Sequence, residues 1–147
     1  MTRFGRAGAG VACLVATACA NPLEAPGGPS PDAGAAVVTY VVDGDTIDVN
    51  VNGRSERVRL IGVDTPETVD RERPEQCFGA EASARTAALA PIGTTVRLER
   101  DEVSRDRYGR LLAYVWNADD VLVNLALIEG GFADAVTYGD NEALYDV

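Results

Sequence analysis

The sequence predicts a mainly β domain of the α+β class, an OB-fold five-stranded barrel with two to three helices. Two observations lead to this prediction. Apolar and polar residues alternate along three successive segments joined by tight turns, which is the pattern of strands that bury one face. A helical segment and two more strand segments follow. Three strands, a helix and two strands make the chain order of an OB-fold, which often holds nucleic acids or sugars.

The first three strands form a meander. Residues 37–42 are rich in Val, and Asp43-Gly44 after them is a turn signal. In residues 46–53 an apolar side chain stands at every second position, which predicts a strand with one buried face. This segment ends in Asn52-Gly53, a strong hairpin signal, and residues 54–63 form the return strand.

The remaining elements follow in order. Residues 78–89 are Ala-rich and read as a helix that stops before Pro91. Residues 94–100 and 110–116 are two strands, and residues 123–131 are a short helix closed by a pair of glycines.

The first 35 of the 147 residues have a different composition from the rest. Residues 1–18 carry two arginines and then a short apolar run, which predicts a signal peptide. The run ends in VATAC, which resembles a bacterial lipobox with Cys19 as the acylated residue; the alternative is an ordinary cleaved signal peptide with an incidental Cys19. Residues 19–35 are rich in Pro, Gly and Ala and predict a disordered tether, and residues 36–147 form the domain. We therefore expect an exported protein, lipid-anchored to the cell membrane or secreted.

Composition excludes several kinds of chemistry. The chain has no histidine, so a Ser-His-Asp triad, a Cys-His pair and a His-ligated zinc site are all excluded. The net charge of −10 argues against broad attraction to nucleic acid but leaves room for a local basic site. Cys77 is the one thiol of the predicted domain, and we expect it to have no chemical role.

Two aspartates occupy unusual positions in the predicted strands. Asp45 stands two positions before Ile47, and Asp64 stands four positions after Leu60, so each has the same strand parity as an apolar residue. Alternation therefore predicts both carboxylates on the apolar side, where an unpaired charge is costly. Together they would suit a hard cation, with backbone carbonyls and water completing its shell. The alternative is that Asp43, Asp45 and Asp64 are ordinary turn residues.

Arginines accompany these acids. Arg59 precedes Asp64 in the same segment, and Arg110 follows in DRYGR. Guanidinium groups beside a carboxylate-bound cation are what phosphoryl transfer needs, although each arginine alone could be a surface residue. Strict alternation places Arg59 and Asp64 on opposite faces, so a bulge or bend near Gly62 is required to bring them together.

The chain resembles the staphylococcal nuclease (thermonuclease) family over residues 38–138. The matching segments, in family order, are VVDGDTIDV, VRLIGVDTPET, FGAEASARTAA, DRYGRLLAYVW and LVNLALIEGGFADA. The resemblance implies an OB-fold phosphodiesterase, a sugar-non-specific endonuclease that cleaves DNA and RNA with one Ca²⁺ and leaves 3′-phosphate ends.

Residue roles follow from this resemblance alone. The implied metal ligands are Asp45, Asp64 and the carbonyl of Thr65, with Asp43 as an outer acid. The implied catalytic residues are Glu67, which positions or deprotonates the attacking water, and Arg59 and Arg110, which clamp the phosphate. The implied nucleotide contacts are Tyr108 and, by a looser match, Tyr138.

The chain departs from the family in two respects. The binding face of the family is more basic than this acidic domain, and residues 141–147 look like only the first part of the family's C-terminal helix. We expect a monomer that takes DNA and RNA as substrates and meets the membrane through an acylated Cys19. Two other functions stay open: a catalytically silent OB-fold that binds nucleic acid or another ligand as a surface lipoprotein, and a Ca²⁺-stabilised module that binds a glycan or a protein.

Overall fold

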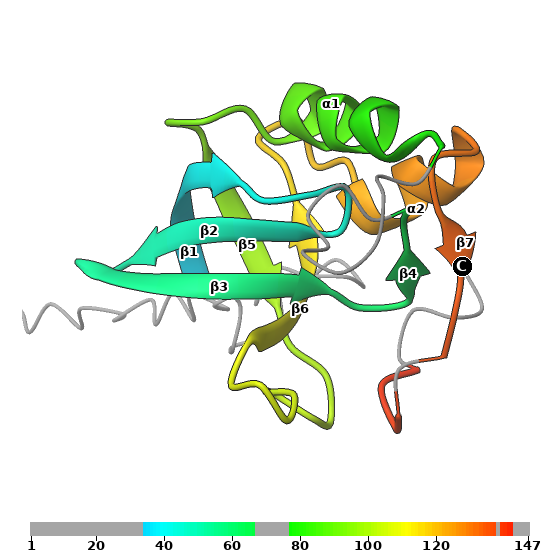
Figure 1. Ribbon diagram of the computed structural model, residues 1–147. Coiled ribbons are helices and arrows are strands. Elements are labelled where there is room, and N and C mark those ends of the chain that lie inside the picture. Colours follow the sequence, from blue (N-terminus) through cyan, green and yellow to red (C-terminus); the bar gives the residue numbers. More distant parts are fainter. Residues whose placement is uncertain (1–33, 67–76, 138, 143–147) are drawn as a thin grey trace, which may run out of the picture.

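The computed structural model describes residues 34–66, 77–137 and 139–142. Five strands close into a barrel in the order β1-β2-β3-β6-β5 (Figure 1). These strands are β1 (Gly34–Val41), β2 (Thr46–Val51), β3 (Arg54–Leu60), β5 (Thr95–Glu99) and β6 (Leu111–Trp116). Strand β3 pairs with β6 in parallel, and the other four pairs are antiparallel. The predicted five-stranded OB-fold barrel is therefore confirmed.

Two helices lie together at one end of the barrel. Helix α1 (Gly79–Leu89) crosses above the strands in Figure 1, and α2 (Val123–Glu129) packs against both α1 and β6. Two short strands, β4 (Val63–Asp64) and β7 (Asp134–Ala135), pair beside the barrel. The sequence predicted both helices but neither of these short strands.

The barrel is filled by apolar side chains that occur at every second position of the strands. They are Val38, Ile47, Val49, Val58, Leu60, Val96, Leu98, Leu111, Ala113 and Val115. Because successive side chains of a strand point to opposite faces, this alternation gives each strand one buried face. Val123 and Leu127 of α2 are fully buried against the same cluster.

The predicted hairpin between β2 and β3 is confirmed. Asn52 and Gly53 have φ of 53° and 84°, and a two-residue turn with both φ values positive matches the twist of the strands that it joins. Strand β1 begins at Gly34, two residues before the predicted start of the domain at Ala36, because Gly34 and Ala35 pair with β5.

The predicted strand over residues 54–63 is interrupted. Strand β3 ends at Leu60, and Gly62 has φ of 77°, a conformation that residues with a Cβ atom rarely adopt. Asn124 of α2 holds this turn, because its side chain donates to the Ile61 carbonyl at 2.8 Å and accepts the Val115 amide at 2.9 Å. The bend expected near Gly62 is thus present, and it redirects the chain into β4.

Several predictions concern parts of the chain outside the described residues. They are the signal peptide over residues 1–18, Cys19, most of the tether over residues 19–35, and the end of the segment over residues 141–147. Within the described residues, no helix is long and apolar enough to cross a membrane.

Candidate active site

The turn between β1 and β2 places a carboxylate inside the protein. Asp45 is 2% exposed, and its backbone N–H donates to Asp43 Oδ1 at 3.1 Å. Thr86 of α1 donates its hydroxyl to the Gly44 carbonyl at 2.6 Å, which fixes the turn against the helix. Asp45 is therefore buried, but its contacts are with Arg59 and Thr65 and not with the apolar cluster of the barrel. Thr46, which has the opposite strand parity, is equally buried, so the burial of Asp45 does not test the predicted alternation.

Close packing leaves no room for a side chain at Gly44. A Cβ atom there would lie 2.7 Å from Thr65 Oγ1 and 2.8 Å from Ala82 Cβ, closer than such atoms normally approach. The turn therefore packs directly onto α1 and onto the segment after β4. This contact brings Asp45 and Thr65, which are 20 positions apart in the sequence, into one site.

A single guanidinium group joins the two aspartates. Arg59 Nη2 lies 3.0 Å from Asp45 Oδ2 and 3.0 Å from Asp64 Oδ1. Arg59 Nη1 donates to the carbonyls of Leu60 at 3.1 Å and Val63 at 2.7 Å. Arg59 thus holds the turn after β3 in place and sets the positions of both carboxylates.

The charge on Asp45 is incompletely balanced. Burial raises the pKa of this carboxyl, and the neighbouring Asp43 adds to the increase. The Arg59 guanidinium and hydrogen bonds from Thr65 N (3.0 Å) and the Thr46 hydroxyl (3.0 Å) oppose the increase without cancelling it. A further cation beside Asp45 would therefore stabilise its ionised form.

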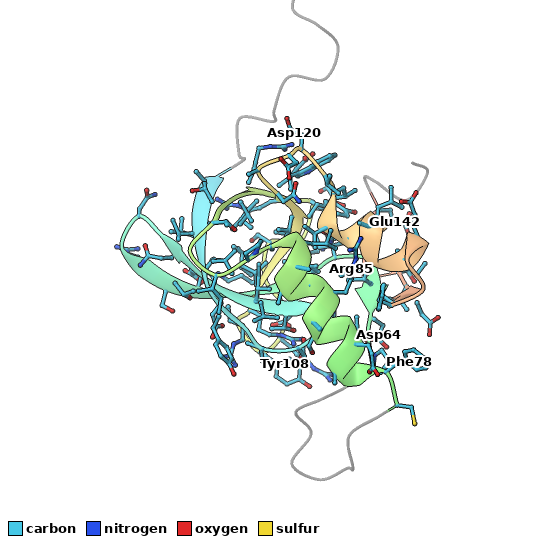
Figure 2. All side chains as sticks on the ribbon, turned by 90° about the horizontal axis from the view of Figure 1, so that it is seen from above. Asp64, Phe78, Arg85, Tyr108, Asp120 and Glu142 are labelled. Atoms are coloured by element: carbon cyan, nitrogen blue, oxygen red, sulfur yellow. The ribbon has the colours of Figure 1, made fainter. Side chains whose placement is uncertain are left out.

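Asp64 is less buried than its place in the sequence predicts. Strand parity with Leu60 placed it on the apolar side, but its side chain is 60% exposed (Figure 2). The turn through Gly62 resets the alternation, so parity counted across it is wrong. The same turn lets Asp64 reach Arg59 although the two residues lie on opposite faces by strict alternation.

The donor atoms at this site suit a hard divalent cation. Asp45 and Asp64 contact the same nitrogen atom of Arg59, so their carboxylates converge, and Thr65 is buried next to them. Oxygen ligands of this kind are the ones that Ca²⁺ and Mg²⁺ prefer. Within the ranges that the structure describes, no three His, Cys, Asp or Glu side chains gather closely enough to hold a metal. Two carboxylates with a backbone carbonyl and water fit the cation better than a cage of side chains.

The loop between β5 and β6 carries the second predicted arginine. Arg110 Nε donates to Asp106 Oδ2 at 2.6 Å, and the backbone N–H groups of Arg110 and Tyr108 both donate to Asp106 Oδ1 at 2.9 Å. Burial acts to raise the pKa of Asp106, but these hydrogen bonds outweigh it and hold the pKa below its ordinary value. Asp106 therefore stays ionised and orients Arg110.

Sequence reasoning did not identify Asp106. The signal was present, because an aspartate that begins a turn commonly accepts N–H groups two and four positions later. Tyr108 is 69% exposed, and the centre of its ring lies 5.5 Å from the Arg110 guanidinium carbon. An exposed ring beside a fixed guanidinium is suited to contact a base next to a bound phosphate.

A cavity of about 460 Å³ lies between this loop and strands β2 and β3. Its lining residues are Asp48, Ser55, Arg57, Tyr108, Gly109 and Arg110. Arg57 forms a two-point ion pair with Asp48, with distances of 2.7 and 2.9 Å. The predicted residues Tyr108 and Arg110 thus share one hollow of the surface.

Two predicted site residues, Glu67 and Tyr138, lie outside the described residues, so their roles stay predictions. Cys77 is exposed and forms no disulfide within the described part of the chain.

Comparisons with known proteins agree with the motifs. A family model described as "Staphylococcal nuclease homologue" matches residues 57–146, a range that includes Arg59, Asp64 and Arg110. The chain is 47% identical over 106 residues to a thermonuclease of Staphylococcus intermedius, an alignment that covers 72% of this chain and 62% of the relative. It is 46% identical over 104 residues to a thermonuclease of Staphylococcus hyicus (71% of this chain, 60% of the relative). Identity to Endonuclease YncB of Bacillus subtilis is 42% over 110 residues (71% and 50%). The chain therefore spans between half and two thirds of the length of these relatives.

Proposed function

Because the chain belongs to the staphylococcal nuclease family, we propose that it is a Ca²⁺-dependent phosphodiesterase, a sugar-non-specific endonuclease that hydrolyses DNA and RNA and leaves 3′-phosphate ends. The observation that carries this proposal is the joining of buried Asp45 and exposed Asp64 through Arg59. Carboxylate oxygens for a cation and a guanidinium for a phosphate thereby meet at one place on the barrel.

The metal would be held by the carboxylates of Asp45 and Asp64 and the carbonyl of Thr65. When bound, Ca²⁺ supplies a Lewis acid that polarises a phosphate oxygen. The chain prepares its side of the site beforehand, because Thr65 N–H and the Thr46 hydroxyl fix the two oxygens of Asp45. Preformed ligands lose little conformational entropy when a cation arrives.

The arginines would stabilise the negative charge that develops on the phosphate during attack by water. Arg59 stands among the carboxylates, and Arg110 is oriented by Asp106. Cationic donors fixed before the reaction stabilise a transition state without a cost of reorientation. The resemblance assigns the water-orienting role to Glu67, whose carboxylate would take the proton of the water.

The proposal is tested by hydrolysis of a single-stranded DNA and an RNA oligonucleotide, each with Ca²⁺ and with a chelator. Glu67→Gln and Arg110→Ala are compared with Arg107→Ala, which removes an exposed arginine of the same loop that contacts Tyr108. Circular dichroism confirms that each variant is folded. We expect Ca²⁺-dependent cleavage with 3′-phosphate ends, abolished by the first two substitutions and retained in Arg107→Ala.

Folded protein that binds Ca²⁺ but leaves both nucleic acids intact would refute the proposed nuclease activity. It would favour the catalytically silent binding module instead. Cleavage that persists in Arg110→Ala would show that the assigned arginine is wrong.

We further propose that the protein is exported, anchored through an acylated Cys19, and monomeric. The sequence pattern of residues 1–18 supports the export and the anchor. Expression of the full chain with Cys19→Ser should move the protein from the membrane fraction to the soluble fraction, and light scattering of the wild type in detergent should give one chain per particle. An unchanged distribution would contradict the anchor.

A further inference from the structure

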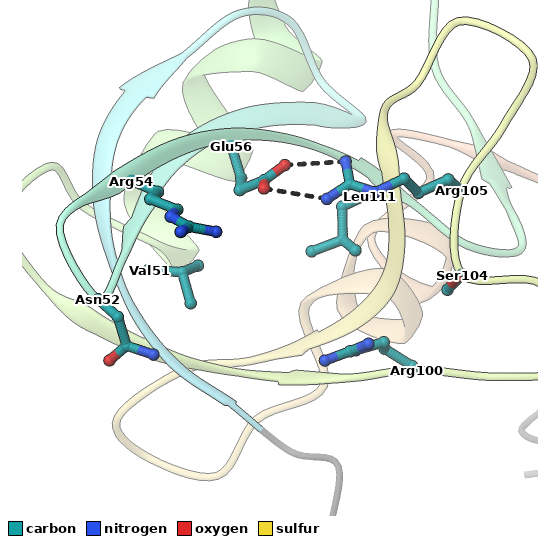
Figure 3. A pocket seen from close by; sticks show the side chains of 8 residues that line it. All are labelled: Val51, Asn52, Arg54, Glu56, Arg100, Ser104, Arg105 and Leu111. Carbon is teal, nitrogen blue, oxygen red and sulfur yellow. Dashed lines mark hydrogen bonds and ion pairs between the residues drawn. The ribbon is translucent and has the colours of Figure 1, made fainter.

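A second hollow lies at the barrel mouth between the β2–β3 hairpin and the loop that follows β5 (Figure 3). Its volume is about 400 Å³, which is within the range of small-ligand sites. Its lining residues are Val51, Asn52, Arg54, Glu56, Arg100, Ser104, Arg105 and Leu111.

This hollow is separate from the one beside Arg110. Arg54 and Glu56 of β3 line the barrel-mouth cavity, whereas Ser55 and Arg57 line the other. Successive side chains of a strand point to opposite faces, so the two hollows lie on the two sides of β3. No residue is shared between their linings.

One wall of the barrel-mouth cavity is formed by an ion pair, Arg105 with Glu56, whose two charges cancel. Arg105 makes two hydrogen bonds of 2.9 Å to the carboxylate of Glu56 and a third of 2.8 Å to the Gly109 carbonyl. The hydrogen bond from Arg105 holds the pKa of Glu56 below its ordinary value. Glu56 therefore stays charged and is already matched to Arg105.

Two further arginines face the same space without a hydrogen-bonded acid in the described residues. The charge of Arg54 acts on Glu56, but the hydrogen bonds of that carboxylate go to Arg105. Figure 3 shows Arg54 and Arg100 directed into the cavity from opposite sides. Neither guanidinium group makes a hydrogen bond or ion pair with any residue in the described part of the chain. The lining thus has three arginines and one glutamate, a positive excess in a chain whose net charge is −10. Like charges that converge on one cavity repel each other, and a bound anion relieves that repulsion.

We propose that the barrel mouth is a phosphate-binding site in which Arg54 and Arg100 hold one phosphate group between them. Guanidinium groups match phosphate oxygens in two-point geometry, which chloride cannot reproduce. The cavity volume of about 400 Å³ leaves room for the sugar of a phosphate ester beside Asn52, Ser104 and the apolar Leu111. The ligand class is a phosphate monoester or diester. Binding here requires no hydrolysis, so the inference does not depend on the proposed nuclease activity.

The test titrates the full chain with inorganic phosphate in the presence of a chelator, at constant ionic strength, and follows the arginine side-chain N–H signals by NMR. Arg54→Ala and Arg100→Ala are measured separately. The control Arg85→Ala removes one exposed arginine from α1. We expect Arg54→Ala and Arg100→Ala each to weaken phosphate binding at least about tenfold, the change that corresponds to losing one charge-assisted hydrogen bond. Arg85→Ala should stay within about twofold of the wild type, as expected for an exposed charge on α1 that does not line the cavity.

Three results would overturn the proposal. If Arg85→Ala weakened phosphate binding as much as the other two substitutions, the binding would be general charge attraction. If chloride competed as well as phosphate, the site would lack two-point recognition. Weakening by Arg110→Ala alone would place the phosphate in the candidate active site.

The source of the phosphate is resolved by repeating the titration with a 3′-nucleoside monophosphate and with single-stranded DNA. A fall in DNA affinity in Arg54→Ala and Arg100→Ala would identify the strand backbone as the source. Unchanged DNA affinity with lost nucleotide affinity would identify a free phosphate ester.

Discussion

Replacement of Arg59 by Met should destabilise the metal-free protein far more than a typical loss of an ion pair. The Arg59 side chain is 7% exposed and that of its partner Asp45 is 3% exposed. The substitution leaves the Asp45 charge buried without its counter-charge, and two backbone carbonyls lose their donor. Removing one partner of a buried pair costs about 3–5 kcal/mol, so we expect a loss of that size in the free energy of unfolding.

Strand β3 supplies a matched control two residues earlier. Arg57 also forms a two-point ion pair, with Asp48, but its side chain is 52% exposed. An exposed pair contributes about 0.2–1 kcal/mol, so Arg57→Met should cost no more than that. Urea denaturation of both variants, followed by circular dichroism in chelator at pH 7, measures the difference.

A second variant keeps this test decisive if Arg59→Met does not fold. Asp45→Asn combined with Arg59→Met removes the unpaired charge and should recover part of the loss. Acidification should also reduce the cost of Arg59→Met, because protonated Asp45 needs no counter-charge. Equal losses in Arg59→Met and Arg57→Met, or no recovery in the double variant, would refute the reasoning.

Two other substitutions test neighbouring parts of the site. Gly44→Ala should lower the free energy of unfolding by about 1–3 kcal/mol in a urea titration, because the new methyl group would meet Thr65 and Ala82 at 2.7 to 2.8 Å. An unchanged unfolding midpoint would contradict the packing. Asp106→Asn should lower the rate of DNA cleavage at least about tenfold with the fold retained, because Arg110 loses its charged acceptor. The pKa of Asp106 is lowered by folding, so its stabilising effect is complete above about pH 4 and is lost as the pH falls further. The stability difference between wild type and Asp106→Asn should therefore narrow below about pH 4, and a difference that widens there would contradict the assignment.

Strand alternation was a reliable guide to the barrel. It correctly placed the apolar side chains of β2, because each side chain of a regular strand faces opposite to the next. It failed at Asp64, because Gly62 interrupts the strand and parity does not carry across a turn. The strands β4 and β7 have two residues each, which is too short for a periodic pattern to appear.

Parts of the two cavities could not be predicted from local patterns. Arg54 and Arg100 are 46 positions apart in the numbering and look like ordinary surface residues, and only barrel closure brings them to one cavity. The role of Asp106 depends on a turn that returns Arg110 to it. Motifs that lie within one segment, such as Asp43 to Thr46, were recognisable because their contacts are local.

The measurement that tests the central claim most directly is the rate of Ca²⁺-dependent cleavage of single-stranded DNA by Asp45→Asn. An Asn side chain can keep the contacts of Asp45, since its oxygen accepts from Thr65 N–H and Arg59 while its amide donates to the Thr46 hydroxyl. We therefore expect the variant to fold in chelator, because Arg59 keeps the Asp64 carboxylate and the Leu60 and Val63 carbonyls as partners. The rate should fall at least about 100-fold, since even the partners of metal ligands are worth about 10–100-fold. Cleavage by Asp45→Asn at the wild-type rate would contradict the assignment of Asp45 to the metal and of the chemistry to this site.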